Sequence, residues 1–284
     1  MRLAYIVSAY RYPEQLVRLV TRLDTPTSSF FVHVDSKTAE QTFRAMTDGL
    51  AHLSNVMFVR RHRCEWGGFG HVAASLEGIG AALRLRPTFD YALLLTGQDY
   101  PIKSNRHILD FFRQHPGHQF MEYFPVPHAG WQNGGLDRVD AWHWRMAGRH
   151  YALTPLPRLR FRRRIPGGLK PFGGSSYWCL TRQCIEYVDQ YVKRNPSLVK
   201  FFRHVDVPDE LFFQTIILNS PLADTVVNDN LRYIAWDEPD EGSPVILDGS
   251  HLEQLMASPK LFARKFDVTV DADVLDAIDH LVPA

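Results

Sequence analysis

A polar turn at residues 96–99, Thr-Gly-Gln-Asp, is the first stretch whose side chains could bind a ligand. It follows the unbroken apolar run 91–95, which is typical of a strand covered on both faces, and Pro101 closes it. Open α/β sheets present binding groups in turns at the carboxyl ends of such strands. The alternative is that Gly97 and Asp99 only form a turn and satisfy local backbone N–H groups. The pattern places a candidate site here.

Two charged pairs later in the chain could also act on a substrate. Asp209 and Glu210 stand at the start of a predicted apolar helix, where carboxylates also stabilise the helix dipole by about 0.3–1 kcal/mol. Arg264 and Lys265 lie near the end of a helix predicted over 258–267. Their alternative interpretation is an exposed basic helix face.

Alternating strand and helix patterns must position these groups. This order predicts a mainly parallel sheet with right-handed crossovers, an α/β fold. The strands are predicted at 3–7, 30–34, 56–59 and 91–95, and the helices over 16–23, 43–53 and 72–83. After a break, a strand is expected at 177–180, a helix capped by Thr181, and a late strand at 231–237.

The segment 117–171 shows no regular pattern and is expected to form a binding loop or lid. Its tryptophans, including Trp142 and Trp144, could stack on sugar rings or simply fill a core under the loop. The arginine run from Arg158 to Arg164 could form a strand edge, a patch for anionic lipid or polysaccharide, or a solvated face.

Composition indicates an ordinary globular protein. The chain has 284 residues, 45% of them hydrophobic and 22% charged, and a net charge of +1 that argues against a general nucleic-acid binder. No apolar run reaches the length of a membrane span, and the sequence enters a predicted strand at Leu3, so no signal peptide and a cytoplasmic location are expected. Three cysteines without Cys-x-x-Cys spacing indicate reduced thiols.

Seven blocks of sequence, in order along the chain, resemble the core-2/I-branching β-1,6-N-acetylglucosaminyltransferase family, which includes the peptide O-xylosyltransferases. The resemblance covers nearly the whole chain except 117–171 and the end after about Val268. The blocks are IVSAY at 6–10, HVDSK at 33–37, WGGF at 66–69, LLTGQDYPIKS at 94–104, GSSY at 174–177, PDE at 208–210 and LFARKFD at 261–267.

The resemblance implies a GT-A type glycosyltransferase fold and an inverting transfer of a sugar from a UDP donor to a hydroxyl. The sugar is expected to be GlcNAc. It implies one domain over 1–284, with a nucleotide-binding half at 1–116, an acceptor-side segment at 117–171, and a catalytic and diphosphate-binding half at 172–284. No cofactor and no metal are expected. No convincing Asp-x-Asp pair follows a predicted strand, where a metal–diphosphate site would be expected.

By the same resemblance, Glu210 matches the catalytic base that takes the proton from the attacking hydroxyl. Lys265, with Arg264 beside it, matches the lysine that binds the diphosphate. A second family cation is missing from 242–245, and Arg232 or an arginine of the 158–164 run could replace it. Asp209 is expected to cap the helix that follows.

The donor and acceptor walls are also assigned by resemblance. Asp35 matches residues that contact uracil and ribose, with Val7 and His33 on the same wall, and Asp99 is expected beside the donor sugar. The acceptor residues are expected to be Trp236, Trp142 and Trp144.

Together these features predict a bacterial-type transferase that builds a surface polysaccharide on a saccharide or lipid-linked glycan, with weak contact to the inner membrane surface through the arginine run. The alternatives are a UDP-xylose or other UDP-sugar transferase, a metal-dependent enzyme, or a non-catalytic nucleotide-sugar or glycan-binding protein.

Overall fold

A seven-stranded sheet, ordered β12-β6-β11-β4-β1-β2-β3, forms the centre of the computed structural model, which describes residues 1–84, 88–146, 148–154, 163–236 and 243–283. Strands β3, β2, β1 and β4 run parallel, and β11 joins β4 and β6 in the antiparallel sense. The predicted α/β class with a mainly parallel sheet is therefore confirmed. The strands span Leu3–Ala9 (β1), Ser28–Val34 (β2), Val56–Phe58 (β3), Tyr91–Thr96 (β4), Gln119–Met121 (β6), Trp178–Thr181 (β11) and Val226–Val227 (β12).

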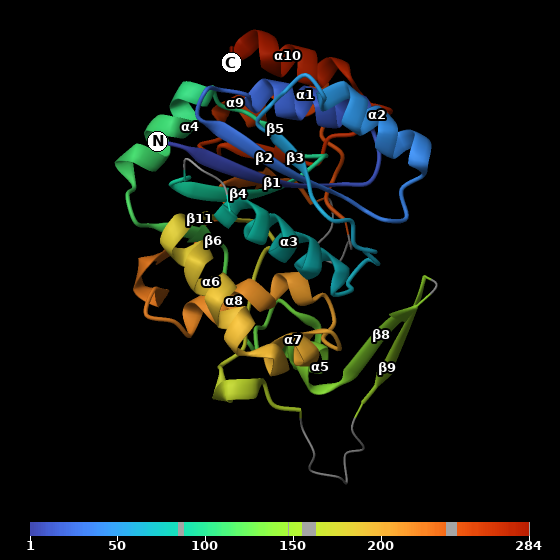
Figure 1. Cartoon of the computed structure of the whole chain (residues 1–284), viewed down its shortest axis with the longest axis vertical. Coiled ribbons are helices and arrows are strands. Elements are labelled where there is room, and N and C mark those ends of the chain that lie inside the picture. Colours follow the sequence, from blue (N-terminus) through green and yellow to red (C-terminus); the bar gives the residue numbers. More distant parts are fainter. Residues whose placement is uncertain (85–87, 147, 155–162, 237–242, 284) are drawn as a thin grey trace.

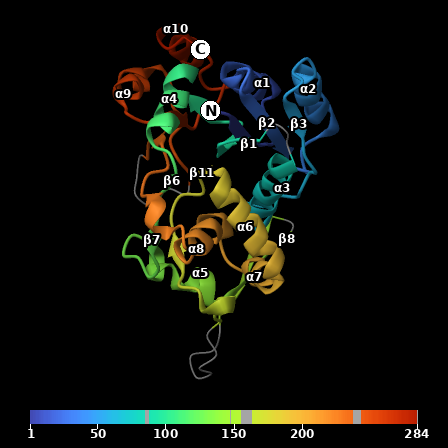
Figure 2. The ribbon, with the colours of Figure 1, turned by 60° about the vertical axis from the view of Figure 1, so that its left-hand side comes forward.

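Helices cover both faces of this sheet (Figures 1 and 2). Tyr5 and Val7 of β1 pack into one buried cluster and Ala4 and Ile6 into the other, because successive strand side chains point to opposite faces. One layer holds α1 (Pro13–Leu23), α2 (Glu40–Leu50), α4 (Asn105–Gln114), α9 (Leu252–Ala257) and α10 (Asp273–Leu281). The other holds α3 (Gly70–Arg84), α6 (Arg182–Arg194), α7 (Pro196–Phe202) and α8 (Phe212–Leu218).

The start of α6 follows from a local signal in the sequence. Thr181 caps α6 as predicted, its side chain accepting a hydrogen bond from the backbone N–H of Cys184 at 3.2 Å. Within the described ranges, the helices lack the combination of length and apolar character that crossing a bilayer requires.

A three-stranded sheet lies beside the carboxyl edge of the central one and corrects a prediction. The helix predicted over 258–267 is wrong: this stretch contains strand β14 (Phe262–Arg264), between β13 (Arg232–Ile234) and β5 (Tyr100–Pro101). Its residues Phe262 and Ala263 are completely buried between the two neighbours. A short apolar run buried on all sides carries no period that separates strand from helix.

The segment 117–171 is more regular than predicted, since it supplies β6 to the central sheet. A β8–β9 hairpin projects from the body (Figure 1). The other elements of the chain are β7 (Phe124–Pro125), η1 (Gln132–Gly135), α5 (Leu136–Asp140), β8 (Trp142–Met146), β9 (Arg149–Leu153), η2 (Pro166–Gly168), β10 (Phe172–Gly173), η3 (Pro208–Glu210), η4 (Ala223–Thr225) and η5 (Gly249–His251). Residues 158–162 of the arginine run, with their predicted strand edge and anionic patch, lie outside the described residues.

Candidate functional site

The turn after β4 is built around the buried carboxylate of Asp99. Oδ2 of Asp99 accepts hydrogen bonds from the backbone N–H of Thr96 and, at 2.9 Å, from its hydroxyl. Its Oδ1 lies 3.2 Å from Nε of Arg264. Asp99 therefore closes the turn, as one interpretation of the sequence expected, and also holds a cation from β14 at the edge of the sheet.

Three cations gather beside this turn. The guanidinium carbon of Arg264 lies 4.3 Å from the ring centroid of Tyr177. Lys265 contacts the hydroxyl of Ser243. Burial lowers the pKa of Lys265, and the positive charges of Arg264 and Arg11 lower it further. Positive charges held close enough to disfavour the ionisation of Lys265 indicate a place that receives an anion.

Arg11 is a member of this group that the sequence did not single out. It follows the carboxyl end of β1, and its Nη2 donates to Oε1 of Gln98 at 3.2 Å, inside the turn after β4. Its Nη2 also lies 3.5 Å from a carboxylate oxygen of Asp267. Because β1 and β4 are parallel neighbours, a cation two residues beyond β1 was the available signal.

Glu210 supplies a carboxylate poised near neutral pH. It ends η3, and its Oε2 accepts a hydrogen bond of 2.7 Å from Nη1 of Arg138, whose guanidinium carbon stacks 3.8 Å from the Trp131 ring. Burial raises the pKa of Glu210 to about 7; the charge of Asp209 also raises it, and Arg138 opposes both. One third of the side chain remains exposed, so an acceptor group can reach it. A carboxylate with such a pKa can act as a general base.

Asp209 does not cap the following helix, which corrects the prediction. Helix α8 begins at Phe212, and Leu211 occupies its cap position without a side-chain hydrogen bond. The short η3 turn separates Asp209 from α8, and its carboxylate instead accepts a hydrogen bond of 2.8 Å from Ser176.

Residues 174–177 lie between the backbone of Glu210 and the cation Arg264. The backbone N–H of Gly174 donates to the carbonyl of Glu210 at 3.0 Å. Three residues later, the ring of Tyr177 lies under the guanidinium of Arg264. One four-residue segment thus contacts the backbone of Glu210 and the side chain of Arg264, and we treat the carboxylate and the cations as a single candidate site.

Gly174→Ala tests how closely this segment packs against the neighbouring backbone. A Cβ at Gly174 would lie 2.0 Å from the carbonyl oxygen of Glu122, so the backbone must shift. We expect a loss of about 1–3 kcal/mol in the free energy of unfolding, measured by urea denaturation. In the control, Gly80→Ala in α3, the nearest atom is 3.6 Å away and stability should stay level or rise by about 1 kcal/mol. Equal effects of the two changes would contradict the tight approach at Gly174.

Asp35 lies at the carboxyl end of β2, as the sequence predicted for a donor-contacting residue. Its Oδ1 accepts a hydrogen bond of 2.9 Å from the backbone N–H of Lys37, and Nζ of Lys37 lies 3.7 Å from Oδ2. The residue is 7% exposed, so only its edge is open to a ligand.

Val7 and His33, assigned to the same wall, have buried side chains. That of Val7 is in the core. Nε2 of His33 accepts a hydrogen bond of 2.9 Å from the backbone N–H of His62, which requires an unprotonated nitrogen. Burial and, to a smaller extent, the charge of His62 lower the pKa of His33 to about 4. Both side chains are almost fully buried, and direct contact with a donor stays a prediction for them.

Arg232, considered as the second cation, is buried beneath the site. Its Nη2 donates to the carbonyl of Leu94 at 2.6 Å, and its Nη1 donates to Asn230 and lies 3.1 Å from the sulfur of Cys179. These contacts fix the guanidinium within the sheet. Of Arg232 and Arg11, the structure places Arg11 among the site cations.

The three predicted acceptor tryptophans lie on two separate elements. Trp236 follows β13, is 51% exposed and lines a cavity of about 230 Å³ together with Glu122. Trp142 and Trp144 lie on β8, where Trp142 packs against Arg163. Sequence reasoning missed Glu122: burial raises its pKa, and its charge raises that of Glu210.

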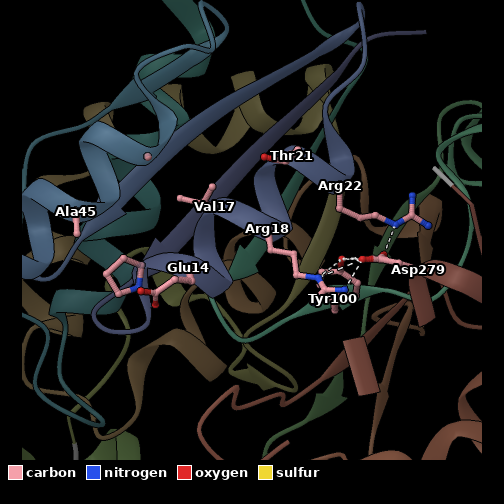
Figure 3. Close-up of a pocket in the computed structure, with 10 residues that line it drawn as sticks. Glu14, Val17, Arg18, Thr21, Arg22, Ala45, Tyr100 and Asp279 are labelled. Carbon is pink, nitrogen blue, oxygen red and sulfur yellow. Dashed lines mark hydrogen bonds and ion pairs between the residues drawn. The ribbon is translucent and has the colours of Figure 1, made fainter. Parts of the chain in front are cut away.

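A second cavity, of about 650 Å³, lies along α1 (Figure 3). There Nη2 of Arg18 is 2.6 Å from Oδ2 of Asp279, and the hydroxyl of Tyr100 donates to the same carboxylate at 2.8 Å. Arg22 also pairs with Asp279. Because these groups bond to one another and pin α10 onto α1, the cavity is better explained as structural.

The chain is similar in sequence to known xylosyltransferases. Xylosyltransferase 2 of Rattus norvegicus is 28% identical over 99% of this chain and 34% of its own length. Xylosyltransferase 1 of Homo sapiens is 26% identical over 99% of this chain and 30% of its own length. The chain thus spans about a third of these relatives.

A solved 4-diphosphocytidyl-2C-methyl-D-erythritol synthase from Anaerococcus prevotii aligns with 72% of this chain and 83% of its own. The TM-score of 0.35 and identity of 10% are too low to support an argument. The family model described as Core-2/I-Branching enzyme matches residues 3–255, and the chain therefore belongs to the core-2/I-branching enzyme family.

Proposed function

We propose that this chain transfers a sugar from a UDP donor to a hydroxyl of a saccharide acceptor, with inversion at the anomeric carbon. Family membership supports sugar transfer. The observation that supports the mechanism is the carboxylate of Glu210, with a pKa raised to about 7, on a residue whose backbone is hydrogen-bonded to the segment 174–177 that also contacts Arg264.

In this proposal Glu210 acts as the general base. The acceptor oxygen attacks the anomeric carbon on the face opposite the diphosphate, and Glu210 takes its proton as the new C–O bond forms. The bond from the anomeric carbon to the diphosphate oxygen breaks, and UDP leaves with the electron pair. Arg138 keeps the pKa of Glu210 from rising further, so that the base is ionised near neutral pH.

The charge that develops on the leaving diphosphate is assigned to Arg264, Lys265 and Arg11. Fixed cations at a developing charge are a large catalytic term. They support the expectation that the diphosphate needs no metal. Asp35 is proposed to bind the nucleoside, Asp99 to position Arg264 beside the donor sugar, and Trp236 to face the acceptor.

The donor sugar is proposed to be GlcNAc or xylose. GlcNAc follows from the first expectation, whereas the two relatives named xylosyltransferases favour xylose. A panel of UDP-sugars with turnover as the readout separates them. The acceptor is proposed to be a saccharide or lipid-linked glycan, and the site of action the cytoplasm or inner membrane surface.

Thermal unfolding with and without millimolar UDP, once in EDTA and once in Mn²⁺, tests the proposed donor site. At 100 times the dissociation constant, UDP should stabilise the fold by about 2.7 kcal/mol, or roughly 5–10 °C. Each shift is taken against the same buffer without UDP, so that any direct effect of metal cancels. A shift only in Mn²⁺ would contradict metal independence, and no shift in either would contradict the UDP site.

Arg138→Met should move the acid limb of the pH–rate profile upward. Removing the cation raises the pKa of Glu210, and a base works only when deprotonated, so activity at low pH is lost first. We expect the midpoint in kcat/KM to rise from near 7 by about 1 pH unit or more. Arg44→Met, on an exposed pair in α2, is the control and should leave the midpoint in place. An unchanged midpoint in Arg138→Met would mean that another group titrates.

A further inference from the structure

Two histidines and an aspartate meet where the β8–β9 hairpin joins the body. His143 lies on β8, His150 on β9, and Asp206 in the segment between α7 and η3. One potential ligand atom from each lies within 4.8 Å of the other two. His143 is buried, whereas His150 is 37% exposed.

Hydrogen bonding fixes the tautomer of His143. Its Nε2 lies 2.9 Å from the carbonyl oxygen of Asp137, which can only accept, so Nε2 carries the proton. Nδ1 therefore presents a lone pair, and Nε2 of His150 lies 2.9 Å from it. An imidazole held through one nitrogen by a backbone carbonyl, with the other nitrogen free to ligate, is the usual arrangement of a metal-binding histidine.

We propose that His143 Nδ1, His150 Nε2 and a carboxylate oxygen of Asp206 bind a divalent transition metal of the zinc type. Two imidazoles and a carboxylate suit such a cation. In the metal-free state a proton lies between the two histidines. Ligand bonds of about 2.0–2.1 Å in tetrahedral geometry need a nitrogen separation of about 3.3 Å, so the rings must open by a few tenths of an ångström.

A metal ion could reach the site through a cavity, but it would compete with Arg145 for Asp206. A cavity of about 670 Å³, lined by His143, Arg145 and Gly67, leads to it. The guanidinium of Arg145 donates to Oδ1 of Asp206, the oxygen that lies 3.7 Å from Nε2 of His150. The cation therefore either uses Oδ2 or displaces Arg145, and this competition weakens binding.

Metal binding would tie the hairpin to the segment that leads into η3. The backbone N–H of Asp206 donates to the carbonyl of Arg138 at 3.0 Å, and that of Val207 donates to Gly67 at 3.0 Å. Glu210 follows three residues after Val207. A metal at this place acts through the backbone and is separate from the diphosphate cations. The proposal does not depend on sugar transfer and is tested without donor or acceptor.

The test is a titration of the tag-free, chelator-treated chain with Co²⁺, followed by its visible absorption spectrum. We expect a saturable spectrum at one Co²⁺ per chain, reversed by excess Zn²⁺. All three cysteines are buried, so thiolate-to-cobalt bands should be lacking. His150→Gln, an exposed position that leaves the core intact, should weaken Co²⁺ binding by at least about 10–100-fold.

Asp206→Asn is the second variant and should weaken binding similarly. His107→Gln, which removes an exposed histidine on α4, is the matched control and should leave binding unchanged. The proposal is overturned if no one-to-one spectrum forms, if it survives in His150→Gln, or if His107→Gln reduces it equally, which would mark adventitious binding. Thermal unfolding of each variant without metal shows that it is folded.

Discussion

Glu210→Gln is expected to lower kcat for sugar transfer by about 10²–10⁴-fold while leaving UDP affinity within about threefold of the parent. Glutamine keeps the shape of glutamate and can still accept the hydrogen bond that Arg138 donates at 2.7 Å. It cannot take a proton from an acceptor hydroxyl. Turnover with a saturating UDP-sugar measures the first quantity, and the thermal shift with UDP measures the second.

The matched control is Glu40→Gln, which removes an exposed carboxylate paired with Arg44 on α2. Its kcat should equal that of the parent. Full activity in Glu210→Gln would reject Glu210 as the base. A chain with no measurable turnover in the parent, but with a UDP-induced thermal shift, would favour the nucleotide-sugar-binding alternative.

Glu210→Gln should also change how stability depends on pH. The pKa of Glu210 is near 4.5 when unfolded and about 7 when folded, so its ionisation destabilises the fold progressively as pH rises from 4.5 through 7. Glutamine removes that cost. With solvent screening of a side chain one-third exposed, we expect about 1 kcal/mol, or ~2–4 °C, more stabilisation of the variant over the parent at pH 8 than at pH 5.

The sequence predicts the first half of the fold well because most elements there carry a clear pattern. Residues 3–7 are buried on both faces and form an unbroken apolar run, and Leu16, Leu19 and Leu23 mark one helix face. Strands β1 and β2, and likewise β2 and β3, are parallel neighbours joined by one helix between them in the chain. Local pattern and topology therefore agree.

The second half is less predictable because its contacts join distant segments. Strand β14 pairs with β13, about 30 residues earlier, and with β5, about 160 residues earlier, and its three residues carry no detectable period. Its place beside β5 is what puts Arg264 within 3.2 Å of Asp99. The pair Arg264 and Lys265 was found through resemblance, and its position on a strand could be found only in the structure.

Arg11 and Glu122 were missed for a related reason. A single arginine after a strand, or a single glutamate beside β6, is common on a protein surface, and no local pattern separates them from solvated charges. Their importance arises from neighbours far along the chain: Arg11 contacts Gln98 and Asp267, and Glu122 accepts a hydrogen bond from Asn230 at 3.0 Å.

Lys265→Met is expected to lower kcat/KM by about 10²–10³-fold, because it removes a cation that meets the charge of the leaving diphosphate. Burial lowers the pKa of Lys265, and a bound anion would raise it again. The positive charge of Lys265 should therefore strengthen both UDP binding and catalysis. UDP affinity should fall as well. Lys193→Met, on an exposed i,i+4 pair of α6, is the control and should keep parent activity.

Arg11→Met tests whether Arg11, rather than Arg232 or an arginine of the 158–164 run, is the second cation that binds the diphosphate. If Arg11 shares the diphosphate with Lys265, the single change should cost about tenfold or more in kcat/KM. The fold-loss in kcat/KM of the double variant should then differ from the product of the two single losses. Neighbouring residues that bind the same charged group are coupled by about 0.5–3 kcal/mol. Parent activity in Arg11→Met, with its thermal stability intact, would return the second-cation role to Arg232 or to the 158–164 run. Strict additivity would place Arg11 and Lys265 on different parts of the donor.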